Sequence, residues 1–145
     1  TTLLELDDYY RLPPLANHRE RVADLSRVGP GEVDLGRMQR DLDAFVAGAT
    51  RLEVPIVDRN ADRFDVASVA LDGSRALIVA GTWALRLAVD LRIFVNGDYR
   101  ATAGARRTRA RDRIDAWTDR ILDIEHELIR PDRVLADAVV HPTDL

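Results

Sequence analysis

The densest group of side chains that could do chemistry is a run of arginines. Five guanidinium groups fall within eight residues: Arg106, Arg107, Arg109, Arg111 and Arg113. Guanidinium groups pair bidentately with carboxylates and phosphates, so the run could contact an acidic partner, another subunit or nucleic acid. Aspartates interleave with the arginines and no aromatic residue flanks them. This favours an intersubunit salt-bridge surface or a solvated helix end over nucleic-acid contact.

The histidines do not predict a catalytic or metal site. His18, His126 and His141 are scattered, and no zinc-protease, EF-hand, phosphate-loop or nucleophile-elbow spacing occurs. His126 lies seven residues after Asp119 and could share a helical face with it. The chain has no cysteine, which excludes disulfides and thiol catalysis. We therefore expect no catalytic residue, no cofactor and no metal ion.

Composition describes an ordinary globular chain. Its 145 residues are 46% hydrophobic and 32% charged, with a net charge of −4 that argues against a general nucleic-acid binder. All 21 basic residues are arginine, which fits a GC-rich genome or selection for interfaces. The longest apolar run, Ala76 to Ala80, is too short to span a membrane, and the acidic stretch Thr1–Asp8 is no signal peptide. We expect a virion or cytoplasmic location.

The elements that must position these side chains centre on a predicted long strand, Trp83–Val95. Large apolar residues occupy every second position: Trp83, Leu85, Leu87, Val89, Leu91, Ile93 and Val95. Such alternation is typical of a strand with one buried face. At ~3.3 Å per residue it would span roughly 40 Å, so it could extend as a hairpin arm closed by Asn96-Gly97. Arg86, Asp90 and Arg92 would form ion pairs on its other face and belong to an interface.

A long amphipathic helix is predicted from Arg106 to Ile129. Its apolar positions follow spacings of three and four: Ile114, Trp117, Ile121, Ile124 and Leu128. The arginines at its start are unfavourable for the helix dipole, so we expect them to face a partner. Trp83 and Trp117 are expected in the core, near each other.

The first thirty residues read as an extension. A short helix is expected within Thr1–Tyr10 and a second helix from Asn17 to Val28. The break at Gly29-Pro30-Gly31 then divides the chain into a helical extension or docking arm, 1–31, and a single α+β domain, 32–145.

Within that domain, Asp34 is expected to cap a helix over Leu35–Ala49. Strands are expected at Leu52–Ile56, Phe64–Leu71, Arg75–Val79 and Val134–Val140, with a polar turn at 58–63 and a hairpin at Asp72-Gly73. The predicted class is α+β: an antiparallel sheet with a long hairpin strand and amphipathic helices packed on one face.

This element order resembles the tail-terminator and tail-completion (head–tail joining) proteins of tailed phages. The resemblance covers Asp34 to Val140 and is carried by the strand Trp83–Val95 and the helix Asp112–Ile129. It implies a non-enzymatic structural subunit of a virion tail or neck, assembled as a homo-oligomeric ring with other assembly subunits.

Two other hypotheses remain open. The chain could be a small binding or regulatory module that uses the arginine run on an acidic partner or nucleic acid. It could also be an acid–base or metal-dependent enzyme that uses His126 and nearby carboxylates. Steep salt dependence of nucleic-acid binding would favour the former, and loss of activity in a folded His126→Ala variant would favour the latter.

Overall fold

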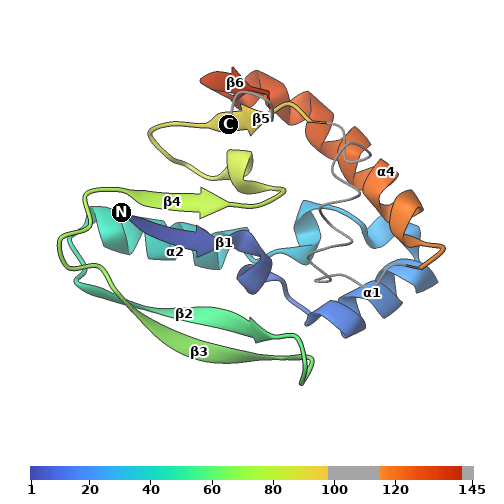
Figure 1. Cartoon of the computed structure of the whole chain (residues 1–145), viewed down its shortest axis with the longest axis horizontal. Helices are drawn as coiled ribbons and strands as arrows, with labels where there is room; N and C mark the ends of the chain where they lie inside the picture. Colours follow the sequence, from blue (N-terminus) through green and yellow to red (C-terminus); the bar gives the residue numbers. More distant parts are fainter. Residues whose placement is uncertain (98–114, 142–145) are drawn as a thin grey trace.

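The computed structural model describes residues 1–97 and 115–141, and these form an α+β protein (Figure 1). In chain order the strands and α-helices are β1 (Thr2–Glu5), α1 (Pro14–Ala23), α2 (Leu35–Val46), β2 (Arg51–Asp58), β3 (Arg63–Ala70), β4 (Leu77–Ala80), β5 (Ile93–Val95), α4 (Thr118–Ile129) and β6 (Ala138–Val140). Short 3₁₀ helices lie between them: η1 (Leu6–Tyr9), η2 (Leu25–Arg27), η3 (Pro30–Glu32), η4 (Ala84–Arg86) and η5 (Arg130–Leu135).

The described strands form three pairs. β2 and β3 are an antiparallel hairpin, with Arg51 opposite Ala70 and Asp58 opposite Arg63. β1 pairs in parallel with β4, and β5 pairs in parallel with β6. The predicted α+β class is therefore confirmed, with one antiparallel hairpin, β2–β3, and two parallel pairs among the described strands. The polar turn expected at 58–63 is the hairpin's turn.

The core lies where α2 meets β1, η1 and the hairpin. Met38 and Leu42 of α2 pack in one cluster with Leu4, Leu6 and further buried side chains. The helix begins as its sequence predicts, because the Asp34 side chain accepts a hydrogen bond from the backbone N–H of Arg37 at 2.9 Å. This cluster fixes η1, the turn that follows β1, against the rest of the molecule.

The long strand predicted over Trp83–Val95 is wrong. After β4 the chain turns through η4, and only Ile93–Val95 is a strand. The guanidinium of Arg92 donates to the carbonyl oxygens of Leu85 and Leu87, at 3.1 and 2.9 Å. These bonds satisfy backbone acceptors that a strand ladder would otherwise use. Two residues of the period-two apolar pattern, Trp83 and Leu87, are buried here, but they flank an irregular turn and do not lie on one face of a strand.

The short helix expected within Thr1–Tyr10 is also wrong. Its first half is β1, and Leu4 and Leu6 belong to the core. The hairpin expected at Asp72-Gly73 does not form, because β4 pairs with β1 and not with β3. The turn dipeptide is present, yet the returning strand finds its partner at the start of the chain. The division of the chain at residue 31 stays a prediction.

The C-terminal helix is confirmed over Thr118–Ile129, which is α4, whereas the described residues 115–117 form a turn before it. Ile121 is buried, as its stripe predicts, whereas Trp117 is 41% exposed and is not the core anchor that its spacing suggests. Trp83, by contrast, is fully buried. The start of the predicted helix, and with it the arginine run Arg106–Arg113, lies outside the described residues, as does the segment expected to pair after Asn96-Gly97.

Candidate functional site

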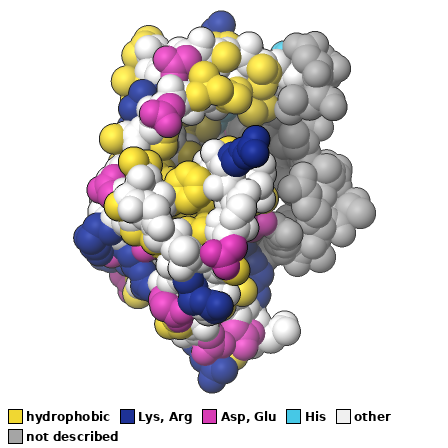
Figure 2. All heavy atoms as spheres, turned by 90° about the vertical axis from the view of Figure 1, so that its left-hand side faces the viewer, with side chains coloured by type: hydrophobic (Ala, Val, Ile, Leu, Met, Phe, Trp, Pro, Cys, Tyr) yellow, Lys and Arg dark blue, Asp and Glu magenta, His cyan; other side chains and the backbone are white. Residues whose placement is uncertain are grey.

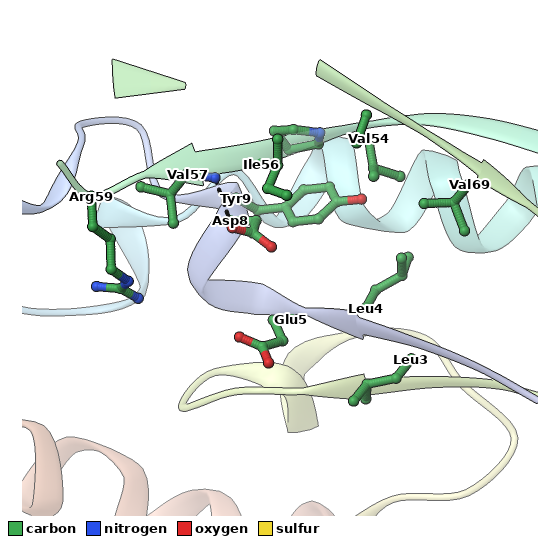
Figure 3. Close-up of a pocket in the computed structure, with 12 residues that line it drawn as sticks. Leu3, Leu4, Glu5, Asp8, Tyr9, Val54, Ile56, Val57, Arg59 and Val69 are labelled. Carbon is green, nitrogen blue, oxygen red and sulfur yellow. Dashed lines mark hydrogen bonds between the residues drawn. The ribbon is translucent and has the colours of Figure 1, made fainter. Parts of the chain in front are cut away.

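An open pocket of about 440 Å³ lies between β1 and the β2–β3 hairpin. Figure 3 shows that its two ends differ in chemistry. One end is apolar, with Leu3, Leu4, Val54 and Val69 around it. At the other end stand the polar side chains Glu5, Asp8 and Arg59, which also line the pocket. The pocket can therefore hold a molecule with one apolar part and one polar part.

The polar end is built by the turn that follows β1. In η1 the first and fourth residues, Leu6 and Tyr9, are buried, because side chains three apart in a 3₁₀ helix lie on one side. The two residues between them, Asp7 and Asp8, are consequently turned away from the core. Two adjacent carboxylates thus follow directly after the carboxyl end of a parallel strand.

Asp8 is held by the neighbouring hairpin. Its Oδ1 accepts a hydrogen bond of 2.9 Å from the backbone N–H of Val57 on β2 (Figure 3). This bond ties η1 to the strand that forms the opposite wall of the pocket. Hydrogen bonds to a charged acceptor are stronger than those between neutral groups. The Asp8 carboxylate therefore holds η1 in place against β2.

Asp7 does not line the pocket itself but lies beside a cation that does. Its carboxylate is 3.6 Å from the guanidinium of Arg59, and its side chain is half exposed. Arg59 is near the end of the hairpin and lines the pocket. A carboxylate that is both accessible and next to a guanidinium can accept a proton or a hydrogen bond from a bound hydroxyl group, while the guanidinium can donate to an oxygen of the same ligand.

Buried charges support this turn from behind. The Arg21 guanidinium of α1 contacts Glu32 of η3 at 2.5 Å and Glu125 of α4 at 2.8 Å. All three side chains are at most 14% exposed. The guanidinium also lies over the ring of Tyr10, 5.8 Å from its centre. One arginine therefore joins three helical segments to the end of η1.

Burial sets the ionisation of this cluster. It raises the pKa of the Glu125 carboxyl, although the nearby Arg21 opposes the rise. Burial also raises the pKa of the Tyr10 phenol, as does the negative charge of Glu125. The pKa of Tyr9 is raised too, first by burial and then by its hydrogen bond of 2.7 Å to Asp41. Both phenols beside the pocket's carboxylates are therefore neutral.

The predicted interface residues Arg86, Asp90 and Arg92 do not lie together on one face of a strand. Arg86 makes a bidentate pair with Asp132 of η5, at 2.7 and 3.1 Å. Arg92 binds backbone carbonyls, and Asp90 is exposed. The cross-strand ion pairs expected among these three are wrong, because their strand does not exist. Whether they or the arginine run contact another chain stays a prediction.

The three histidines lie in different segments of the described structure. His18 pairs with Asp115 at 2.6 Å, while His126 lies on α4. Among residues 1–97 and 115–141, no group of three or more histidine and carboxylate side chains is placed to hold a metal ion. The same part of the chain contains no helix with the length and apolar character of a membrane span.

Sequence reasoning missed the two carboxylates of η1, Asp8 in the lining of the pocket and Asp7 beside Arg59. The sequence places Asp7 and Asp8 immediately after the apolar residues Leu3, Leu4 and Leu6. Read as a strand, that stretch would have indicated polar groups at a strand's carboxyl end, where α/β proteins bind ligands. The apolar spacing of this stretch instead predicts a short helix, so the sequence does not indicate that Asp7 and Asp8 follow the end of a strand. Arg59 carried no comparable signal, since it is one charge in a polar turn.

Comparison with known proteins gives one kind of match. No protein-family model matches the sequence, and no curated protein does either. Among solved structures, the chain is similar to a proposed fructose transport system kinase from Silicibacter sp. TM1040, with a TM-score of 0.56 and 16% sequence identity. The match covers 95% of this chain and 73% of that one. At this identity the likeness concerns the fold.

This match corrects the phage interpretation. The fold of nearly the whole chain is that of a protein described as a kinase, so the resemblance to tail-terminator proteins is wrong, and with it the role as a virion tail subunit without enzymatic activity. The expected virion location has no support either. The resemblance depended on the strand Trp83–Val95, which the structure does not contain. A homo-oligomeric state stays a prediction.

Proposed function

We propose that this chain belongs to a phosphotransferase, and that the pocket between β1 and the hairpin binds its acceptor, a small hydroxylated molecule. The observation that carries the proposal is the ion pair of Asp7 with Arg59, whose side chain lines the polar end of this pocket together with Asp8. The likeness in fold to a proposed fructose transport system kinase supports the same class. The acceptor's hydroxyl group would lie at the carboxylates, and its less polar part against Leu4 and Val54.

In this proposal Asp7 is the general base. Phosphoryl transfer needs an acceptor oxygen held in line with the phosphorus atom, and a carboxylate that takes the hydroxyl proton as that oxygen attacks. The new P–O bond forms to the acceptor, the bond to the donor nucleotide's leaving oxygen breaks, and the proton passes to Asp7. Arg59 would hold the carboxylate and donate to the acceptor. Asp8 would keep η1 against β2.

Steady-state kinetics with the whole natural protein test this assignment. The assay contains ATP, Mg²⁺ and a panel of small hydroxylated molecules, beginning with D-fructose. For an acceptor that is phosphorylated, Asp7→Asn should lower kcat by about 100-fold or more, because general-base catalysis contributes 10²–10⁴-fold. Ligand-observed NMR should show acceptor binding within about threefold of the unmodified protein.

A matched control is Asp65→Asn. Asp65 is a carboxylate on β3 that pairs with a neighbouring arginine, Arg63, and does not line the pocket. It should leave kcat unchanged. Equal losses in the two variants, or an Asp7→Asn variant with full activity, would contradict the role given to Asp7. A panel in which no molecule binds the pocket would contradict the proposed function.

A further inference from the structure

Within residues 1–97 and 115–141, each of the two parallel strand pairs has an edge that no other described strand covers. Among the described residues, β4 has only β1 as a neighbour and β5 has only β6. In Figure 1 the two strands point in the same direction, and η4 with the chain around it is drawn between them. Parallel strands are ordinarily found inside sheets covered on both faces, and two-stranded sheets are marginal alone. These pairs therefore have the geometry of two parts of one sheet.

One face of these strands is apolar and uncovered. Leu3 of β1 and Ile78 of β4 are partners in the ladder, so they lie side by side, and they are 56% and 50% exposed. On the opposite face of the same pair, Leu4 is only 4% exposed. In the second pair, Ile93 and Val95 are both about half exposed. Figure 2 shows a hollow with hydrophobic side chains in the upper half of the molecule.

We propose that a strand followed by a helix, carried by the same polypeptide outside residues 1–145, completes this sheet. The strand lies between β4 and β5, parallel to both, and the helix covers the face that Leu3 and Ile78 expose. Connections between parallel strands require a crossover, usually a helix, which lies on a face of the sheet. A strand–helix unit therefore meets both needs, the two open edges and the uncovered face.

The comparison supports this occupant over a second copy of the chain. About a quarter of the matched solved structure lies outside the aligned part, while nearly all of this chain lies inside it. A βαβ unit needs about 30 or more residues, of which the final strand, here β1, is already present. A second copy, by contrast, would have to insert a strand that its own sheet already uses. The inference is independent of the proposed function.

Photocrosslinking in the whole natural protein tests the occupant. Ile78→p-benzoylphenylalanine and, separately, Ile93→p-benzoylphenylalanine place a photoreactive ring on the uncovered face. Mass spectrometry of the digested product should find crosslinks to a peptide outside residues 1–145. Val66→p-benzoylphenylalanine is the matched control, because Val66 is 65% exposed on the hairpin strand β3. It should give less than about one tenth of that crosslink.

Hydrogen exchange on the unmodified whole protein provides a second measurement, which requires no substitution. The backbone amides of β4 and β5 that do not bond to β1 or β6 should exchange about 100-fold or more slowly than an open edge allows. The proposal is overturned if these amides exchange as an open edge. It is equally overturned if the crosslinked peptide comes from residues 1–145, within the molecule or from a second copy.

Discussion

Asp7 and Asp8 are adjacent and have different tasks because a 3₁₀ turn gives each a different neighbour. Asp8 accepts a hydrogen bond from the backbone N–H of Val57, whereas Asp7 pairs with the guanidinium of Arg59, a residue that lines the pocket. One carboxylate therefore holds two elements together and the other is accessible to a ligand. The pair could be predicted from the sequence only as two acidic residues, since their separate partners lie about fifty residues away in the hairpin.

Removing the Asp8 carboxylate should destabilise the protein. Asp8→Ala leaves the partly buried N–H of Val57 without its acceptor, and hydrogen bonds to charged groups contribute about 1.5–3 kcal/mol. We expect a loss of about 2 kcal/mol in the free energy of unfolding, measured by urea denaturation. Asp65→Ala, on the exposed face of β3, should change it by less than about 0.5 kcal/mol. Equal effects would contradict the role given to Asp8.

Arg21 should be far more sensitive than a surface arginine. Arg21→Met leaves the carboxylates of Glu32 and Glu125 buried without their cation, and breaking a buried pair in this way costs about 3–5 kcal/mol. The control is Arg27→Met. Arg27 pairs with Glu20 where both side chains are about half exposed, so its loss should cost at most about 1 kcal/mol. Thermal and urea unfolding of the two variants measure the difference, and a ratio near one would contradict this account.

The raised pKa of Glu125 predicts a direction for the pH dependence of stability. A carboxyl group whose pKa is higher in the folded state binds its proton more tightly there than in the unfolded chain. Its contribution is therefore complete below the unfolded value of about 4.3 and is lost as the pH rises through the folded value. The unmodified protein should lose stability relative to Glu125→Gln as the pH rises above about 4.

Urea denaturation at several pH values measures this difference. Glu127→Gln is the control, because Glu127 is on the same helix and its side chain is 65% exposed. Its free energy of unfolding should follow that of the unmodified protein throughout. A difference between the unmodified protein and Glu125→Gln that does not change with pH would contradict the burial effect.

At the scale of elements, the close approach of β4's end to η1 fixes the site. Gly81 follows β4 with a φ of +158°, and a Cβ there would overlap the Cβ of Leu6. Leu6 is 1% exposed and starts the turn that carries Asp7 and Asp8. The glycine is therefore what lets the carboxyl end of β4 pack against the candidate site.

Adding one methyl group at this contact should be costly. Gly81→Ala forces η1 or β4 to move, and overpacking a core contact costs about 1–3 kcal/mol. We expect a loss in that range by urea denaturation, together with weaker acceptor binding because η1 shifts. Gly31→Ala is the control, since a Cβ there would have nothing within 4 Å. A Gly81→Ala variant as stable as Gly31→Ala would contradict the close approach.

Local signals predicted some elements well and others poorly, for a physical reason. The helix after Asp34 has its cap and its stripe within one stretch, so the start of α2 could be predicted to the residue, whereas its end is expected at Ala49 and lies at Val46. β1 and β4 depend on pairing between segments more than seventy residues apart. Nothing local distinguishes Thr2–Glu5 from the start of a helix. The position of the candidate site is equally hard to predict from the sequence, because the site lies between the end of β1 and the distant β2–β3 hairpin.

At the scale of the whole molecule, the pocket, the buried Arg21 and the exposed apolar face of the strands all adjoin β1 and η1. The hairpin forms one wall of the pocket and β1 the other, while α1 and α4 meet at Arg21 behind η1. The uncovered face of β1 and β4 lies beside the strand end that carries the carboxylates. A strand–helix unit added there would enclose the side of the site that is now open.

Phosphorus NMR of the whole natural protein with ATP, Mg²⁺ and a bound acceptor tests the central claim most directly. We predict a new phosphomonoester signal that grows in equal amounts with ADP. In Asp7→Asn, the rate at which this signal grows should fall to about 1% or less of the rate in the unmodified protein. ATP consumed only to ADP and inorganic phosphate, with acceptor bound and no phosphomonoester formed, would contradict the claim that this pocket presents a hydroxyl group for phosphoryl transfer.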